Sequence, residues 1–390
     1  MHTHIIKDLL GFKDIIIGNT EVLQEYTSID ITLKRSIHNC PQCTSPTDKV
    51  HDYRIQSIKE LAIFERLTLI NYRKRRYICP CCNKRFYENN DFIGRYQRSS
   101  KRVIAAVVNA LRSNYSMKSI AQKYFISLNS ISRILHALKY TPSKLPRVLS
   151  IDEFRGNTGG EKFQCILVDA ENRKVYDILP KRTSVDLEKY FRQFDNHNDV
   201  EFFVTDMWKP YRDLAKKLFP RATIIIDRFH YVRNAIWAMD NVRRRVQKEV
   251  SKAEYKFFKG CRRLLLAKPE KLSDGLKIKL SEVLMRNETI RRAYELKACF
   301  VTFVKADNYL LAQNLLIRFL STASDYNIPE FNKLAKTLKN WRPEILNSFK
   351  APYSNGCTEG YNNKIKVIKR NAFGFKSFQR FRNRILHTCQ

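Results

Sequence analysis

Apolar and polar positions divide the chain into a strand-rich beginning, a helical stretch, a mixed middle and a long helical end. Short alternating runs at 14–17 and 29–33 predict strands near the start. Apolar residues in 99–138 recur with helical spacing, and the prolines of 141–146 favour a domain boundary there. The chain is therefore expected to begin with a small β-rich unit that is followed by helices.

The middle of the chain predicts a mixed sheet. Five runs are strand-like: 148–152, 163–169, 174–179, 200–205 and 222–226. Helices are expected before and after the fourth run. Three hairpin-like strands followed by alternating helix and strand are typical of an α/β domain whose helices flank a mixed sheet. From 232 to about 342 the pattern predicts only helices, and helical spacing returns at 359–386.

The charge balance indicates a partner that carries phosphates. Lys and Arg number 72 against 38 Asp and Glu, so the formal net charge is +34. Such an excess repels itself in a compact protein, but it suits DNA, whose phosphates release condensed counterions when basic side chains neutralise them. Apolar residues make up 44% of the chain and aromatic residues 12%, which argues against a disordered protein.

Nothing in the sequence predicts a membrane partner. No apolar run approaches the roughly 18 residues of a spanning helix, and the first residues lack a basic segment followed by an apolar one, so no secretory signal is expected. The 10 cysteines are therefore expected as metal ligands or buried thiols of an intracellular chain rather than as disulfides.

Two cysteine pairs predict a zinc site. Cys40 and Cys43 form the first CxxC pair, and Cys79 and Cys82 form the second. Each pair places two thiolates on one tight turn, and two such turns complete a tetrahedral Zn²⁺ site. The alternatives are two unrelated sets of buried thiols or a redox pair, which is disfavoured because neither pair opens a helix. We expect a structural Zn²⁺ in a zinc-ribbon-like DNA-binding domain over 1–95.

A helix–turn–helix is predicted within a second domain over 96–145. Ser116 begins a short helix, 126–127 form the turn, and a second helix follows over 128–136. On the second helix three side chains remain free to contact base edges: Asn129, Ser130 and Arg133. Phosphate contacts are expected from the basic run Arg73, Lys74, Arg75 and Arg76. The alternative interpretation of 116–136 is an ordinary helical hairpin.

Acidic residues end two of the predicted strands. Asp152 ends the first strand of the sheet and Asp206 follows the fourth. If the two strands are neighbours, their charges meet, which is unfavourable unless a cation neutralises them, and hard oxygen ligands suit Mg²⁺ or Mn²⁺. Glu359 on a distant helix is the candidate third acid for a two-metal phosphoryl-transfer site. Taken singly, an Asp at a strand end is more often a turn residue.

Further polar residues accompany these acids. Asn363 and Lys366 lie on the helix of Glu359, and we expect that helix face to offer an amide and a cation to DNA. Asp227 and His230 stand at the start of the helix after the fifth strand, where they can orient each other by hydrogen bonding. The alternative is an Asp N-cap beside a packed His, and both can hold together.

Together these motifs resemble the bacterial insertion-sequence transposases of the ISL3 family, which are DDE enzymes with an RNase H-like, retroviral-integrase fold. The resemblance covers nearly the whole chain. Besides the cysteine pairs it rests on these segments: 151–153, Asp206 with Met207 and Tyr211, 220–222, 227–230, 354–356, 359–362, 371–375, Phe378, Phe381 and Arg382.

The resemblance implies a division of the chain and a set of site residues. It implies that 146–231 and 350–390 form an RNase H-like α/β catalytic core, and that 232–349 is a helical insertion in that core. It implies that the metal-binding triad is Asp152, Asp206 and Glu359. Related mutator-like families carry a Cys/Asp-x-x-His element, which Asp227 and His230 match in an auxiliary role.

The activity implied by the resemblance is Mg²⁺-dependent cleavage of DNA at element ends, followed by strand transfer into target DNA. The expected partners are terminal inverted repeats and target DNA, bound by a homodimer or higher oligomer in the bacterial cytoplasm, in association with the nucleoid. One alternative is a zinc-ribbon and helix–turn–helix regulator that has lost catalysis, which the intact triad argues against. Another is a structure-directed RNase H-like nuclease, which the sequence-reading domains argue against.

Overall fold

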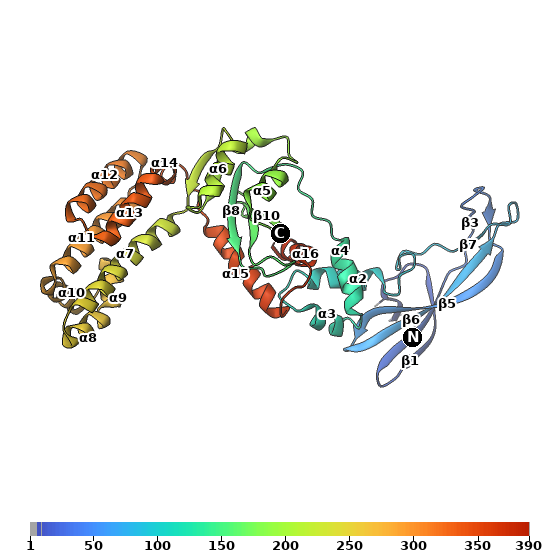
Figure 1. Ribbon diagram of the computed structural model, residues 1–390. Coiled ribbons are helices and arrows are strands. Elements are labelled where there is room, and N and C mark those ends of the chain that lie inside the picture. Colours follow the sequence, from blue (N-terminus) through green and yellow to red (C-terminus); the bar gives the residue numbers. More distant parts are fainter. Residues whose placement is uncertain (1–5, 9, 390) are drawn as a thin grey trace. The chain divides into compact units, whose positions relative to one another are not determined.

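The computed structural model describes residues 6–8 and 10–389, which form two compact units (Figure 1). One unit comprises the chain up to Tyr140 together with Val367–Cys389, and the other comprises Thr141–Lys366. Within the described residues, none of the helices is both long and apolar enough to span a membrane.

The first unit begins with a twisted β-sheet. Its strands are β1 (Ile15–Val22), β2 (Tyr26–Leu33), β5 (Val50–Ile63), β6 (Arg66–Ile78) and β7 (Arg85–Tyr87). The order is β1-β2-β6-β5, with β7 paired to β6, and only the β2–β6 pairing is parallel. Alternation along β2 buries Ile29 and Ile31 against Ile58, Ile70 and Tyr72. A small hairpin, β3 (His38–Asn39) with β4 (Pro46–Thr47), precedes the long β5–β6 hairpin.

Helices complete the first unit. They are α2 (Lys101–Ala110), α3 (Met117–Lys123), α4 (Leu128–Ala137) and α16 (Phe378–Cys389). Ser100, Ser116 and Ser127 begin the first three, and each hydroxyl accepts a hydrogen bond from the backbone N–H three residues on. The α3–α4 turn is tight because Phe125 adopts a left-handed φ of 52°. The second helix of the predicted pair thus begins at Leu128, as expected.

The C-terminal helix α16 belongs to this helical group. The Asn383 amide donates to the backbone carbonyls of Leu135 (3.1 Å) and Leu138 (3.3 Å). The His387 ring hydrogen-bonds the Val108 carbonyl in α2, and the Thr388 hydroxyl donates to the Leu111 carbonyl just after α2. Arg384 donates to the carbonyls of Ser113 and Tyr115. The last carbonyls of a helix have no hydrogen-bond partner within that helix. Side chains of α16 supply donors for such carbonyls at the ends of α2 and α4. Residues 350–390 were expected in the catalytic core, but from Val367 to Cys389 they group with the first unit.

We expect Asn383→Ala to destabilise this helical group by about 1–3 kcal/mol, because it leaves buried carbonyls of α4 without a donor. Amide hydrogen exchange in α4 should accelerate accordingly. Arg380→Ala is the matched control, since Arg380 is an exposed residue of the same helix. Equal protection of α4 in the two variants would contradict the role assigned to α16.

The second unit contains a mixed five-stranded sheet. Its strands are β8 (Val148–Phe154), β9 (Gln164–Asp169), β10 (Lys174–Leu179), β11 (Phe202–Thr205) and β12 (Thr223–Ile226). The order is β10-β9-β8-β11-β12; β8, β9 and β10 pair antiparallel, whereas β11 is parallel to both β8 and β12. The predicted mixed α/β sheet is confirmed, and its first and fourth strands are neighbours.

Helices cover both faces of this sheet. On one face α5 (Ser184–Phe191) and α6 (Lys209–Leu218) pack Leu187, Phe191 and Leu214 against Ile151 and Phe203. On the other face Ala351 packs against Val148 and Val204, and α15 (Gly356–Asn371) follows. Short 3₁₀ turns lie at His197–Asp199 and Pro269–Lys271.

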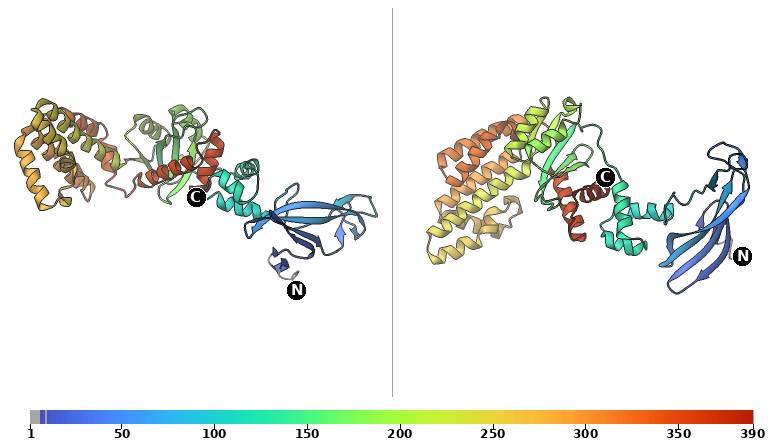
Figure 2. Two further views of the ribbon diagram at one scale, coloured as in Figure 1. Left: turned by 90° about the horizontal axis from the view of Figure 1, so that it is seen from below. Right: turned by 45° about the vertical axis from the view of Figure 1, so that its right-hand side comes forward.

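A helical bundle separates β12 from α15, coloured yellow to orange in Figure 2. Its helices are α7 (Arg228–Glu249), α8 (Lys252–Gly260), α9 (Arg262–Leu266), α10 (Asp274–Arg286), α11 (Glu288–Val304), α12 (Tyr309–Tyr326), α13 (Pro329–Asn340) and α14 (Arg342–Asn347). Their core contains Tyr231, Met239, Phe300, Phe319 and Phe331, all fully buried. Only helices were expected from 232 to about 342, and the described residues of this stretch contain no strand.

Candidate active site and zinc centre

Three acidic residues lie at one edge of the mixed sheet. Asp152 is in β8, Asp206 directly follows β11, and Asp227 directly follows β12. Because these strands are parallel and Val204 pairs with Ser150, continuing the register brings Asp206 level with Asp152. Burial, together with the nearby charges of Asp206 and Asp227, raises the pKa of Asp152 to about 7.

Asp206 is poorly satisfied by the residues around it. Burial raises the pKa of its carboxyl, whereas the nearby His230 and Arg233 side chains act in the opposite direction. Its Oδ1 atom is shielded from solvent and has no hydrogen-bond partner among the described residues. Burying a carboxylate oxygen without a hydrogen-bond donor costs free energy. Coordination of a hard divalent cation by this oxygen would offset that cost.

Helix α15 is attached to this edge through one face. The Asn355 backbone N–H, just before the helix, donates to Asp227 Oδ1 (3.2 Å). The Thr358 and Ser150 hydroxyls lie 2.8 Å apart, and Asn362 Nδ2 donates to Asp152 Oδ2 (2.9 Å). These contacts recur with helical spacing, so they mark the helix face that meets the acids.

Glu359 lies on the same face, one turn after Asn355 and before Asn362. It is exposed. Burial raises the pKa of Asp227, and the charge of Glu359 raises it as well. The structure therefore brings the helix of the third predicted acid to the edge that carries the other two.

The three predicted acids do not form a tight ligand cluster. Among the described residues, only one group of three or more acidic, histidine or cysteine side chains has its ligand atoms all within 4.8 Å of one another, and it is made of cysteines. Mutual repulsion of like charges favours such spacing. In addition, the Asn362 amide occupies one oxygen of Asp152.

Asn362 and Asn363 divide the roles that the sequence analysis gave to Asn363 alone. Asn363 is exposed and accepts a hydrogen bond from Lys366 Nζ (3.1 Å). Asn362, which the sequence analysis did not assign to the site, is 8% exposed and contacts the carboxylate of Asp152. Asn362 follows Asn355 by two helical turns, and this spacing is the sequence signal that could have identified Asn362 as a site residue.

Asp227 and His230 are neighbours without the expected hydrogen bond. His230 Nε2 lies 3.9 Å from Asp227 Oδ2, which is an ion-pair distance, too long for a hydrogen bond. Asp227 instead accepts from the backbone before α15, and His230 Nδ1 lies 3.4 Å from an Arg233 guanidinium nitrogen. The pair thus connects the start of α7 with the start of α15.

Arg75 is not the surface residue that the sequence analysis expected. Its guanidinium pairs with Glu88 (3.1 Å) and donates to the Leu33 carbonyl (2.8 Å), so the side chain is buried. The reason is Glu88, a buried acid that also accepts from the Tyr72 hydroxyl and requires a cation beside it. The assignment of Arg75 to phosphate contact is therefore corrected.

The rest of the basic run remains accessible. Arg73 is exposed and lies over the Tyr53 ring, 4.1 Å from its centroid. Lys74 lies 4.2 Å from the centroid of the Tyr87 ring. Arg76 is half-buried and pairs with Asp52 at 3.4 Å.

Two of the three predicted base-reading residues, Asn129 and Arg133, line an open hollow on α4. The hollow has a volume of about 790 Å³, and its lining includes Ser127, Asn129, Ser132, Arg133, His136 and Arg380. Asn129 and Arg133 are exposed, and Ser130 accepts a hydrogen bond from Arg133 (3.3 Å). Arg380 comes from α16, so the sequence analysis, which placed that helix in another domain, could not include it.

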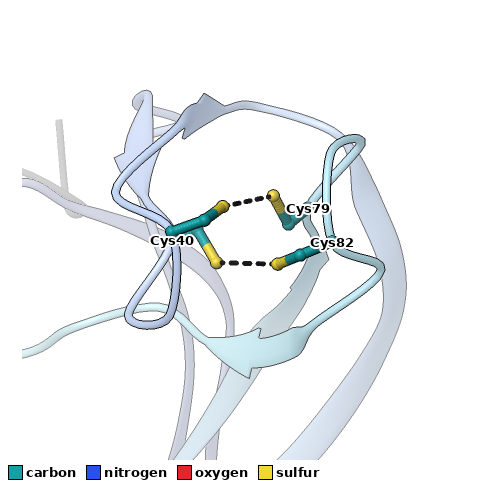
Figure 3. A group of neighbouring side chains, drawn as sticks. Cys40, Cys79 and Cys82 are labelled. Carbon is teal, nitrogen blue, oxygen red and sulfur yellow. Dashed lines mark hydrogen bonds between the residues drawn. The ribbon is translucent and has the colours of Figure 1, made fainter.

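The four predicted cysteines converge (Figure 3). The sulfur atoms of Cys40 and Cys82 lie 3.5 Å apart, and those of Cys43 and Cys79 lie 3.4 Å apart. Hydrogen bonds from the Ser45 side chain and backbone lower the pKa of the Cys43 thiol to about 6, which favours the thiolate that binds metal. Four sulfur donors at one point fit tetrahedral Zn²⁺.

Both cysteine turns have the same backbone conformation. The Cys40 N–H donates to the Ser45 carbonyl and the Cys79 N–H to the Lys84 carbonyl, each at 2.9 Å. The residue after each pair, Thr44 or Asn83, has a positive φ of 60° or 56°. Two equivalent turns facing each other explain how cysteines far apart in sequence meet. Cys81 is exposed and lies outside the cluster.

Two known protein families match separate parts of the chain, the part with the cysteine cluster and the part with the mixed sheet. A family model described as the zinc-finger of the transposases IS204, IS1001, IS1096 and IS1165 matches residues 37–82. The model of the ISL3 DDE transposases, described as a transposase, matches residues 149–385. The chain belongs to the ISL3 transposase family. The resemblance described from the sequence is thereby confirmed, and the cysteine cluster lies at the zinc-finger part of the family.

Individual relatives support the ISL3 assignment. The transposase of IS1001 from Bordetella parapertussis is 25% identical over 352 residues, which are 88% of this chain and 86% of that protein. The transposase of IS1557 from Mycobacterium tuberculosis is 30% identical over 192 residues, 43% of each chain. A Lactococcus lactis protein described as an ATP-dependent protease is 34% identical over 108 residues, 27% of this chain. Because this match covers only 27% of the chain, it does not indicate a protease activity for this ISL3 transposase.

Proposed function

We propose that this ISL3 transposase cleaves DNA at the ends of a mobile element and joins the freed 3′-hydroxyl to target DNA. The observation that carries the proposal is the edge where Asp152 and Asp206 lie on adjacent parallel strands and meet the α15 face that bears Glu359. A sheet in which the first and fourth strands form the central pair is what we expect of an RNase H-like core.

Asp152, Asp206 and Glu359 would hold Mg²⁺ or Mn²⁺. The unsatisfied Oδ1 of Asp206 and the all-oxygen donor set fit such an ion. When bound, divalent ions of this kind activate the attacking hydroxyl and stabilise the leaving oxygen. The protein's part is positional: Asn362 holds one oxygen of Asp152, and the Asp227–Asn355 contact anchors the start of α15.

The auxiliary residues act by orientation and charge. Asp227 ties α15 to the sheet, and His230 with Arg233 offsets the negative charge of Asp206. Lys366, two turns after Glu359 on the same helix face, is placed to hold a DNA phosphate next to the acids. Asn363 accepts a hydrogen bond from Lys366 and so orients its amine.

DNA ends are recognised by the first unit in this proposal. Asn129 and Arg133 in the hollow on α4, together with the adjacent Ser130, contact base edges, as the second helix of a helix–turn–helix does. Arg73, Lys74 and Arg76 contact phosphates. A homodimer or higher oligomer would hold the two ends of the element, and inverted repeats would present the same site to each protomer.

We expect Arg133→Ala to weaken binding to the selected DNA end by about 1–3 kcal/mol and to relax sequence preference, because a base-edge contact is lost. Arg73→Ala should weaken binding to selected and random duplexes alike, since a phosphate contact carries no sequence information. Both affinities should be measured at one salt concentration. An equal loss on both duplexes for Arg133→Ala would contradict its assignment.

The test of the proposed function is strand cleavage itself. A linear duplex carrying the sequence that flanks the coding region of this chain is incubated with the protein and Mg²⁺, with and without a second duplex as target. Cut strands that end in 3′-hydroxyl and covalently joined products are expected. Binding without cleavage would indicate the alternative function, a DNA-binding regulator. Cleavage of branched duplexes irrespective of sequence would indicate a structure-directed nuclease.

A further inference from the structure

Helix α7 presents an aromatic stripe to solvent just beyond the acidic edge. Phe229 is 48% and Trp237 is 54% exposed. The Arg233 guanidinium lies between them, 5.3 Å from the Phe229 ring centroid and 4.8 Å from that of Trp237. The three residues follow one another at intervals of one helical turn, so they form a continuous ladder along one face of the helix.

Folding of the bundle does not require this stripe. The opposite face of α7 supplies the bundle core with Tyr231, Ala235, Met239, Val242 and Val246, all buried. Two aromatic rings that are half exposed on one helix face, beside a guanidinium, offer an apolar surface to a partner, and adjoining exposed apolar side chains can mark a binding site. Rings that alternate with a guanidinium plane are a stacking surface for other flat groups.

The stripe is connected to the candidate active site by direct contacts. An Arg233 guanidinium nitrogen lies 3.4 Å from His230 Nδ1, and His230 Nε2 lies 3.9 Å from Asp227 Oδ2. The positive charge of Arg233 also acts on Asp206. The ladder therefore begins within one side chain of the acids and leads away from them along α7.

We propose that Phe229, Arg233 and Trp237 bind an unpaired DNA base next to the scissile phosphate. This inference rests on the proposed function, because that function brings a DNA strand to the acids. A nucleobase fits the stripe since every base has a face that stacks on aromatic rings and on guanidinium planes, irrespective of sequence. Reaching α7 requires the base to leave its pair, and stacking on the ladder offsets that cost.

Cleavage kinetics test this assignment. We expect Trp237→Ala to cleave a fully paired DNA end about 10- to 100-fold more slowly than the unaltered protein, and Trp237→Phe to stay close to it. Tyr255→Ala is the matched control: Tyr255 is an aromatic residue of the same bundle, 42% exposed, and it belongs to another helix, α8. It should cleave normally.

The same variants are then compared on an end whose base pairs beside the cut are mismatched. If Trp237 compensates for unpairing, the deficit of Trp237→Ala should shrink several-fold on this substrate. A deficit of equal size on paired and mismatched ends, or no deficit on paired ends, would overturn the proposal while the unaltered protein's cleavage upholds the proposed function. Failure of the unaltered protein to cleave either end would overturn both.

Discussion

Asp152→Asn, Asp206→Asn and Glu359→Gln should each slow Mg²⁺-dependent cleavage and joining by about 1000-fold or more, while binding of the DNA end stays unchanged. In the proposed mechanism these acids would hold the ions that supply several kcal/mol of transition-state stabilisation, and each 1.36 kcal/mol is a factor of about ten in rate. The proposed end-binding residues belong to the other unit of the chain, so end binding should not depend on these carboxylates.

The fold should survive these replacements. Burial and neighbouring acids raise the pKa of Asp152 from 3.8 to about 7, so the metal-free protein loses stability progressively as the pH rises between these two values, and the full cost is present above pH 7. A neutral amide removes this repulsion, and the melting temperature of Asp152→Asn at pH 8 should equal or exceed that of the unaltered protein.

A buried carboxylate elsewhere in the sheet is the control. Asp177 in β10 accepts a hydrogen bond from the Tyr190 hydroxyl at 2.7 Å, and Asp177→Asn should retain cleavage. Rates for Asp152→Asn within a few-fold of the unaltered protein would exclude the triad. Loss of end binding in all three acid variants would indicate that the carboxylates serve structure instead.

Removal of zinc should unfold the cysteine turns. Structural Zn²⁺ sites of this kind contribute about 10–16 kcal/mol in apparent binding free energy, and the four cysteines converge on this one point from two separate turns. We expect one zinc per chain by metal analysis. Chelation, or Cys79→Ser, should release it and expose the two cysteine turns, 40–45 and 79–84, to hydrogen exchange and proteolysis.

Cys81→Ser distinguishes ligand loss from a general effect of replacing a cysteine. Cys81 is the sequence neighbour of two ligands but is exposed and outside the cluster, so its replacement should leave zinc content and exchange unchanged. Zinc-free protein purified without chelator, with the turns still protected, would contradict a structural metal.

Several features were predictable because they depend on short stretches of chain. The spacing of each CxxC pair produces its own turn, and the two turns then need only to face each other. The strands of the mixed sheet are apolar runs bounded by turns, and the order of hairpins and helices restricts how they pair. Acids at strand ends follow from that order, since neighbouring parallel strands end at one edge.

Other features depend on partners that are remote in sequence, and only the tertiary structure decided them. Arg75 is buried because Glu88 is, and nothing in a run of basic residues distinguishes that member from its neighbours. Asn362 rather than Asn363 meets Asp152 because the docked face of α15 is set by contacts from Ser150 and Asp227. Helix α16 joins α4 because unpaired carbonyls there require donors. Helical periodicity predicts that a helix has a buried face, but the surface against which that face packs is selected by shape and by unsatisfied polar groups that sequence spacing does not encode.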